Sequence, residues 1–414
     1  LVDSTRVNAE GLIHFKNETP YQQGLVFALL ENDLAIEMLI TEDQTFTLTT
    51  ALSDLNGQMK IEGSLENKLF YETRQFESKI HKEIKTIQQQ LAAKEGDKAI
   101  LEGQLYSAID ERFDYLENLK KQYPHSFYVT YKTSAQSTDM RDYERQTEKL
   151  PMSEYEYIFR KGFWDNVNFA DDRLLATPAI SNKLDKYFNY LVPQESDSII
   201  RYGKALIDKT ELHPAFFQFL TNWMLLNYDP LKSSLMDAEA IYVSLVDNYF
   251  TKEKAFWADS MEVYAFKQKA FAMSMSLLNK QGQDIVGYDV DGNQLSIYNQ
   301  TTNYVALYVF NPKCGLCKEE TPRLVANYDR WKSLGVEVLA VATDTDAAEL
   351  KNYIKENEIK FPVILDENNY LMYPKYYVNR TPELYLLNAE RKIIGKNLMA
   401  DYLESIIESS KKES

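Results

Sequence analysis

The spacing of apolar residues changes twice along this chain, and no other feature constrains its fold as strongly. Residues 1–65 contain short apolar or alternating runs separated by turn residues, which is typical of β-strands. Residues 66–280 carry apolar residues three and four positions apart, as amphipathic helices do. In residues 281–414 strand-like runs alternate with helical segments, which predicts a mostly parallel sheet covered by helices. The sequence therefore predicts an α+β multidomain protein with a small β domain, a central all-α domain and a C-terminal α/β domain.

The N-terminal β domain is small, because residues 1–65 bury little surface on folding. We interpret it as a small sandwich or as an incomplete part of one that depends on the segment after it. Its predicted strands are Leu12–Phe15, Gly24–Leu30, Ala35–Ile40 and Phe46–Thr50.

The central domain begins with two helical stripes, Ile80–Leu91 and Leu101–Leu119, and a break at Glu95–Asp97 separates them. This pattern predicts an αα-hairpin. Aromatic residues such as Trp223 and Tyr242 recur at helical spacing, so we interpret them as core residues. The further helices predicted are Glu154–Val167, Ile180–Leu191, Ser196–Thr210, Ala215–Tyr228, Ala238–Phe250 and Lys254–Leu278.

The composition excludes several classes of partner and site. Lys and Arg total 46 against 62 Asp and Glu, a net charge of −16, which disfavours nucleic acid and anionic membranes. No apolar run reaches the roughly 18–20 residues that span a bilayer. Two cysteines and four scattered histidines suit neither a disulfide scaffold nor a zinc cluster, so we expect no metal.

The two cysteines, Cys314 and Cys317, follow the apolar run Tyr304–Phe310, where a buried strand is expected to lead into a helix. At a helix N-terminus, free N–H groups and the helix dipole would stabilise a Cys314 thiolate. Lys313 and Lys318 add positive charge beside it. We expect Cys317 to be buried one turn later, close enough to form a disulfide. A purely structural disulfide is the alternative, although so short a loop constrains the unfolded chain little.

These residues and their surroundings resemble the thioredoxin superfamily. Pro322 stands five residues after Cys317, as in the family's active-site helix, and Thr381-Pro382 before an apolar strand resembles its cis-proline loop. The resemblance implies that Thr381 and Pro382 present backbone groups to a substrate peptide. The 65 residues from Cys317 to Pro382 are similar to the spacing of the ResA/TlpA-like and peroxiredoxin-like branches, so the C-terminal domain is expected to be thioredoxin-like.

The order of the three domains also resembles multidomain envelope proteins of the Bacteroidetes type. Three helical segments carry this likeness: Phe163–Phe169, Arg173–Pro178 and Lys183–Tyr187. In such proteins a signal segment and further strands precede the first domain, so we expect this chain to begin inside that domain.

The sequence departs from the thioredoxin pattern in ways that concern proton transfer. Lys313 replaces the usual tryptophan, and Tyr308 aligns with the buried acid that serves the second cysteine. Another group must then take the proton of Cys317. Glu383, directly after the proline, is the nearest candidate, with Glu319 and Glu320 behind it; the alternative, which we favour, is that all three are surface carboxylates.

The predicted function is that of a thiol–disulfide oxidoreductase of the bacterial periplasm or cell envelope, acting as a reductase. The resemblance implies disulfide-containing protein substrates, a membrane thiol-transfer protein as electron donor, and no cofactor beyond a redox-active Cys314–Cys317 disulfide. A homodimer is left open. The competing hypothesis is an envelope interaction protein whose thioredoxin-like domain is redox-inactive or structural.

Overall fold

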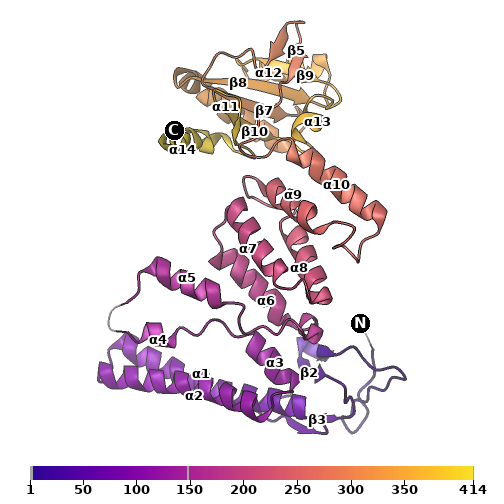
Figure 1. The fold of residues 1–414 in the computed structure, drawn as a ribbon, viewed down its shortest axis with the longest axis vertical. Coiled ribbons are helices and arrows are strands. Elements are labelled where there is room, and N and C mark those ends of the chain that lie inside the picture. The colour runs from indigo at the N-terminus through magenta and orange to yellow at the C-terminus, as the bar shows by residue number, and fades with distance from the viewer. Residues whose placement is uncertain (1–2, 147–148, 414) are drawn as a thin grey trace. The chain divides into compact units, whose positions relative to one another are not determined.

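The computed structural model describes residues 3–146 and 149–413, and the chain packs as two compact units, residues 1–191 and 192–414. Small N-terminal strands, a helical middle and a C-terminal mixed sheet follow one another along the chain, which confirms the predicted fold class (Figure 1). The predicted boundaries after residues 65 and 280 stay predictions. By packing, the chain divides between residues 191 and 192, so the later helices share a unit with the large sheet.

The strands of the first unit form two separate antiparallel pairs. Strand β1 (Gly24–Leu29) pairs with β2 (Ala35–Ile40), and β3 (Thr47–Thr49) pairs with β4 (Lys60–Glu62). The strand predicted at Leu12–Phe15 is wrong. The Asn8 side chain accepts a hydrogen bond from Leu12 N at 2.8 Å and forms a turn there, and both Leu12 and Phe15 are exposed.

The predicted helical hairpin is confirmed as α1 (Leu65–Ala93) and α2 (Lys98–Gln122). The Ser64 and Asp97 side chains cap their N-termini, each by accepting backbone N–H groups of the first turn. Helix α1 ends where Lys94 adopts a left-handed conformation. Short helices that the sequence analysis did not identify follow the hairpin, namely α3 (Phe127–Ser134) and α4 (Arg141–Glu144).

The first unit ends with α5 (Met152–Gly162), α6 (Pro178–Lys186) and a π-helical turn at Tyr187–Leu191. In the second unit, α7 (Ser196–Asp208), α8 (Pro214–Asn227), α9 (Ala238–Tyr249) and α10 (Ser260–Ser274) precede the sheet. Within the part of the chain that the structure describes, no helix is long and apolar enough to cross a membrane.

The large sheet has five strands in the order β11-β10-β7-β8-β9. Its bounds are β7 (Tyr304–Phe310), β8 (Val336–Thr343), β9 (Val363–Asp366), β10 (Glu383–Leu387) and β11 (Ile393–Gly395). The sequence predicts a mostly parallel sheet, whereas only β7–β8 and β8–β9 are parallel; β10 runs antiparallel to both β7 and β11. Strand β7, which pairs with β10, lies about eighty residues away in sequence, and local patterns do not specify this pairing.

Each face of this sheet has its own apolar layer. One layer contains Cys317 together with residues of α11 (Gly315–Ser333), α12 (Ala347–Glu356) and α14 (Leu403–Glu413). The other contains residues of α13 (Met372–Tyr376) and the segment beside the small hairpin β5 (Val286–Tyr288) and β6 (Gln294–Ser296). Alternate residues of each strand point to opposite layers, so the strand position of a side chain decides which layer it joins.

Candidate functional site

The cysteine pair lies where strand β7 leads into helix α11, as the sequence predicts. A tight turn connects them: Asn311 O accepts the Cys314 N–H at 3.0 Å, and Asn311 Oδ1 accepts the Lys313 N–H at 2.7 Å. Cys314 is the N-cap residue of α11, and its Sγ accepts the Cys317 N–H at 3.4 Å. The helix N-terminus therefore directs an N–H donor at the outer sulfur.

The two thiols have opposite electrostatic environments. Burial by itself raises the pKa of Cys314, but hydrogen bonds from Cys317, the Thr381 side chain and the Leu316 backbone outweigh it and lower that pKa below its ordinary value. Cys317 is fully buried, and burial together with its hydrogen bond to Cys314 raises its pKa to about 12. Both cysteines are free thiols, with Cys314 partly exposed. The outer sulfur therefore ionises more readily than the inner one.

Thr381 and Pro382 lie against the outer cysteine. The Cys314 thiol donates a hydrogen bond to the Thr381 backbone carbonyl at 3.2 Å, although 67 residues separate the two in sequence. The Thr381–Pro382 peptide bond is cis, and β10 begins directly after it. The structure thus brings Cys314, Cys317 and the Thr381–Pro382 loop into one site.

The two predicted lysines differ in what they contact. Lys313 Nζ lies 3.0 Å from Glu349 on α12, and this hydrogen-bonded ion pair raises the pKa of Lys313. The negative charge of Glu349 therefore offsets part of the positive charge that Lys313 places beside Cys314. Lys318 is exposed on the first turn of α11. Both lysines line an open hollow of about 820 Å³ that extends along α12 beside the cysteine turn.

Beneath Cys317, three hydroxyl groups replace the buried acid of the thioredoxin pattern. The Tyr353 hydroxyl lies 3.3 Å from Cys317 O and 2.9 Å from Thr321 Oγ1, and the Tyr308 hydroxyl lies 2.9 Å from the same Thr321 oxygen. Burial raises the pKa of both tyrosines, so these groups are neutral near pH 7. The resemblance to thioredoxins identifies Tyr308, because it lies six residues before Cys314, but no local pattern links Thr321 or Tyr353 to it.

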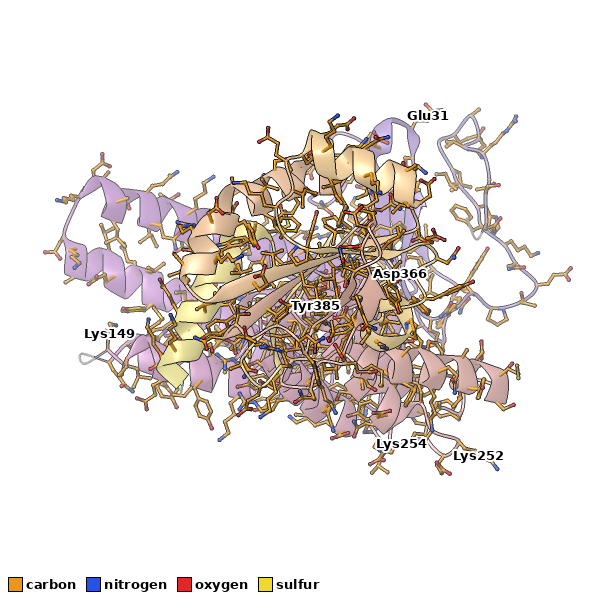
Figure 2. The ribbon with its side chains drawn as sticks, turned by 90° about the horizontal axis from the view of Figure 1, so that it is seen from above. Glu31, Lys149, Lys252, Lys254, Asp366 and Tyr385 are labelled. Atoms are coloured by element: carbon orange, nitrogen blue, oxygen red, sulfur yellow. The ribbon has the colours of Figure 1, made fainter. Side chains whose placement is uncertain are left out.

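Glu383 is not positioned to take the proton of Cys317. It accepts a hydrogen bond from the Tyr385 hydroxyl at 2.6 Å, and Tyr385 belongs to the apolar layer on the sheet face opposite Cys317. Figure 2 shows Tyr385 deep among the packed side chains. The expectation of a surface carboxylate is also wrong, because Glu383 is only 6% exposed and burial raises its pKa to about 7.

The other two candidate acids differ in their burial and contacts. Glu319 is exposed, as predicted. Glu320 is buried, contrary to that prediction, because its carboxylate accepts the Ala400 N–H at 2.5 Å and lies 3.6 Å from Arg323. The contact with Ala400 connects the C-terminal segment to α11.

The structure also contains a buried ionic cluster behind the Thr381–Pro382 loop, which the sequence did not predict. Lys396 Nζ lies 3.4 Å from Asp237 and 3.1 Å from Glu239, and Lys396 is 1% exposed. The cluster links α9 to the segment after β11 within the second unit. Lys396 is about 160 positions from the two acids, and no local sequence signal connects it to them.

Comparison with known proteins agrees with this geometry. Residues 272–396 match the AhpC/TSA family. The thiol-disulfide oxidoreductase ResA of Bacillus thuringiensis subsp. konkukian (strain 97-27) is 25% identical over 174 residues, covering 40% of this chain and 88% of that protein. ResA of Bacillus subtilis (strain 168) is 28% identical over 147 residues, covering 35% of this chain and 80% of its own.

A solved structure extends the likeness in fold beyond the C-terminal domain. A thioredoxin-like protein from Bacteroides caccae ATCC 43185 aligns with a TM-score of 0.52 at 19% identity, covering 63% of this chain and 97% of that one. The predicted resemblance to thioredoxin-like, ResA-related proteins is therefore confirmed, with the domain at the C-terminal position expected for it.

Proposed function

We propose that this chain, whose residues 272–396 form a thioredoxin-like domain related to the ResA thiol-disulfide oxidoreductases, reduces protein disulfides through Cys314 and Cys317. The observation that carries the proposal is the contrast between the sulfurs. One is partly exposed with a lowered pKa at a helix N-terminus, and the other is buried with a pKa of about 12 directly behind it.

The reaction proceeds in two exchanges. The Cys314 thiolate attacks one sulfur of the substrate disulfide, so a mixed disulfide forms and the other substrate sulfur leaves as a thiolate. Cys317, after losing its proton, attacks Cys314 Sγ and releases the second substrate sulfur. Two electrons pass to the substrate, its two sulfurs each take up a proton, and the chain retains a Cys314–Cys317 disulfide.

The surroundings of Cys314 favour a peptide substrate. Once Cys314 is deprotonated, the Thr381 carbonyl loses its thiol donor at 3.2 Å and becomes available to a substrate backbone N–H. The hollow of about 820 Å³ beside Lys313 and Lys318 leaves room for a chain that approaches along α12. Disulfide-containing proteins are therefore the proposed substrates.

Further parts of the proposal rest on the resemblance alone. We assign the chain to the periplasm or cell envelope, with a membrane thiol-transfer protein returning electrons to the Cys314–Cys317 disulfide. No other cofactor is required by this reaction, because the two thiols carry both electrons.

Trapping of the mixed disulfide tests the mechanism. In a Cys317→Ser variant the first exchange occurs and the second cannot, so covalent adducts with substrate proteins accumulate on non-reducing gels. The matched Cys314→Ser variant retains the buried thiol and yields no adduct. Equal trapping by both variants, or by neither, would refute the assigned roles.

A redox titration separates the enzyme from a redox-inactive interaction protein. Equilibration with glutathione or dithiothreitol buffers is expected to give a reversible couple between about −270 and −120 mV, together with insulin reduction in the presence of dithiothreitol. A potential below about −300 mV with no turnover would assign a structural disulfide instead.

A further inference from the structure

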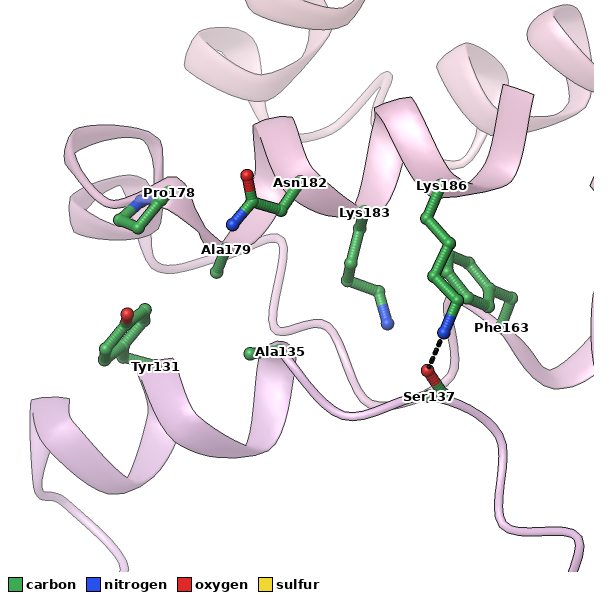
Figure 3. A pocket seen from close by; sticks show the side chains of 9 residues that line it. All are labelled: Tyr131, Ala135, Ser137, Phe163, Pro178, Ala179, Asn182, Lys183 and Lys186. Atoms are coloured by element: carbon green, nitrogen blue, oxygen red, sulfur yellow. Dashed lines mark hydrogen bonds between the residues drawn. The ribbon is translucent and has the colours of Figure 1, made fainter. Parts of the chain in front are cut away.

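A second candidate site lies in the first unit, where helices α3 and α6 and the end of α5 line a half-open cavity of about 180 Å³. Figure 3 shows the amine of Lys183 directed from α6 into the space below that helix, with Lys186 one turn further along. The residues lining the cavity are Tyr131, Ala135, Ser137, Phe163, Pro178, Ala179, Asn182, Lys183 and Lys186.

Lys183 is a buried cation without a carboxylate partner. It is 4% exposed, and its Nζ donates to Gln136 O at 2.6 Å and lies 4.3 Å from the centre of the Phe163 ring. Across residues 3–146 and 149–413, no carboxylate oxygen lies within 4.0 Å of this nitrogen. Ammonium groups carry three donors, and buried charges are normally paired, so two donors of Lys183 remain for another acceptor.

The groups next to Lys183 also favour the binding of an anion in the cavity. Lys186 Nζ donates to Ser137 Oγ at 3.0 Å at the rim of the cavity, so a second positive charge lies close by. Burial, and then the charge of Lys186, lowers the pKa of Lys183 to about 8. Lys186 and the Tyr131 phenol are the other ionisable groups lining the cavity, and burial raises the pKa of Tyr131. Among the residues that the structure describes, no acidic side chain lines it.

The size and lining of the cavity indicate the class of ligand. A cavity of about 150 Å³ is large enough to bind benzene, so about 180 Å³ accommodates one ring or a short aliphatic chain. The rings of Tyr131 and Phe163 with Pro178 provide apolar surface, while Ser137 and Asn182 offer polar groups at the rim. A ligand with an apolar body and a single anionic group would match both the apolar rings and the two lysines of the cavity.

We propose that this cavity binds a small organic monocarboxylate, whose carboxylate pairs with Lys183 and Lys186 and whose apolar body contacts Phe163 and Tyr131. The site is independent of the cysteine pair. Benzoate is a suitable probe because it has one ring and one carboxylate, and benzamide has the same shape without the charge.

Calorimetric titration of the full chain with each probe tests the proposal without any substitution. Benzoate is expected to bind with one-to-one stoichiometry and at least about tenfold more tightly than benzamide, because only benzoate pairs with the buried ammonium. Raising the pH from 7 to 9 should weaken benzoate about tenfold as Lys183, with a pKa of about 8, loses its proton. Equal affinities, absence of benzoate binding, or affinity independent of pH would overturn the proposal.

Substitution then locates the site. Lys183→Met keeps an apolar stem of similar length and is expected to lower benzoate affinity about tenfold, as deprotonation of Lys183 does, while the charge of Lys186 remains. The matched control is Lys161→Met, an exposed lysine of α5 outside the cavity, which should bind benzoate like the unmodified chain. Should Lys183→Met fail to fold, Lys186→Met at the exposed rim replaces it, with a loss of at least about threefold in benzoate affinity expected. Unchanged affinity in the folded variant would refute the assignment.

Discussion

Alkylation of the reduced chain at pH 7 should label Cys314 far faster than Cys317. A thiol with the ordinary pKa of 9.0 is about 1% ionised at pH 7, whereas one with a pKa of about 12 is ionised to about one part in 100,000. Because the pKa of Cys314 lies below 9.0, the ratio of thiolate populations is at least about 1,000. Full burial of Cys317 increases the difference further.

The Cys314→Ser variant separates the causes of this contrast. Burial is the largest contribution to the raised pKa of Cys317, and the hydrogen bond and charge of Cys314 are smaller contributions. Removing the outer sulfur therefore leaves Cys317 unreactive. We expect its labelling rate to stay at least about 100-fold below that of Cys314 in the Cys317→Ser variant.

Intact-mass measurement of samples quenched at intervals after iodoacetamide addition provides the rates. The same reaction in concentrated urea is the control, since both cysteines should label at similar rates once the fold is lost. Comparable rates in the folded variants, or rapid labelling of Cys317 in Cys314→Ser, would refute the assignment of burial as the dominant cause.

Three further predictions concern stability, measured as the free energy of unfolding in urea. Leu386→Ala, at a fully buried position of β10, should cost about 2–5 kcal/mol, and a loss under about 1 kcal/mol would contradict the core assignment. Lys396→Met leaves Asp237 and Glu239 buried without their cation and should cost about 3–5 kcal/mol; unchanged stability would show that the cluster is unpaired in solution. Folding raises the pKa of Glu383 from 4.5 to about 7, so the native state binds more protons between these values and stability falls as pH rises through them. Glu383→Gln should remove this decrease in stability, so the variant should be up to about 3 kcal/mol more stable than the unmodified chain at pH 8 and little different at pH 4. If the stabilities of the two chains changed with pH in parallel, Glu383 would not be the cause.

Much of the fold is predictable because it is encoded locally. Strand β7 begins and ends at the residues predicted, Tyr304 and Phe310, since a continuous apolar run is bounded there by polar residues. The turn of the αα-hairpin falls at Glu95–Asp97, where Gly96 adopts a positive φ and Asp97 caps the next helix. Capping and periodicity involve residues within a few positions of one another, so the sequence alone contains them.

The cysteine site is predictable for the same reason. A buried strand followed by Cys-x-x-Cys at a helix start places Cys314 at the N-terminus and Cys317 one turn inside, and the structure has both there. The contact of Cys314 with Thr381 follows from the family resemblance, not from any pattern near either residue.

Only the tertiary structure determines which face of a sheet a charged residue lies on and which residues surround it. In the sequence Glu383 is simply a carboxylate next to a proline, but the strand register directs that carboxylate to Tyr385 and away from Cys317. Likewise Lys183 is one lysine among many in the helical region, and only packing against Phe163 turns it into a buried cation facing a cavity. Local sequence specifies where helices and strands form, whereas burial depends on distant segments that meet only in the folded chain.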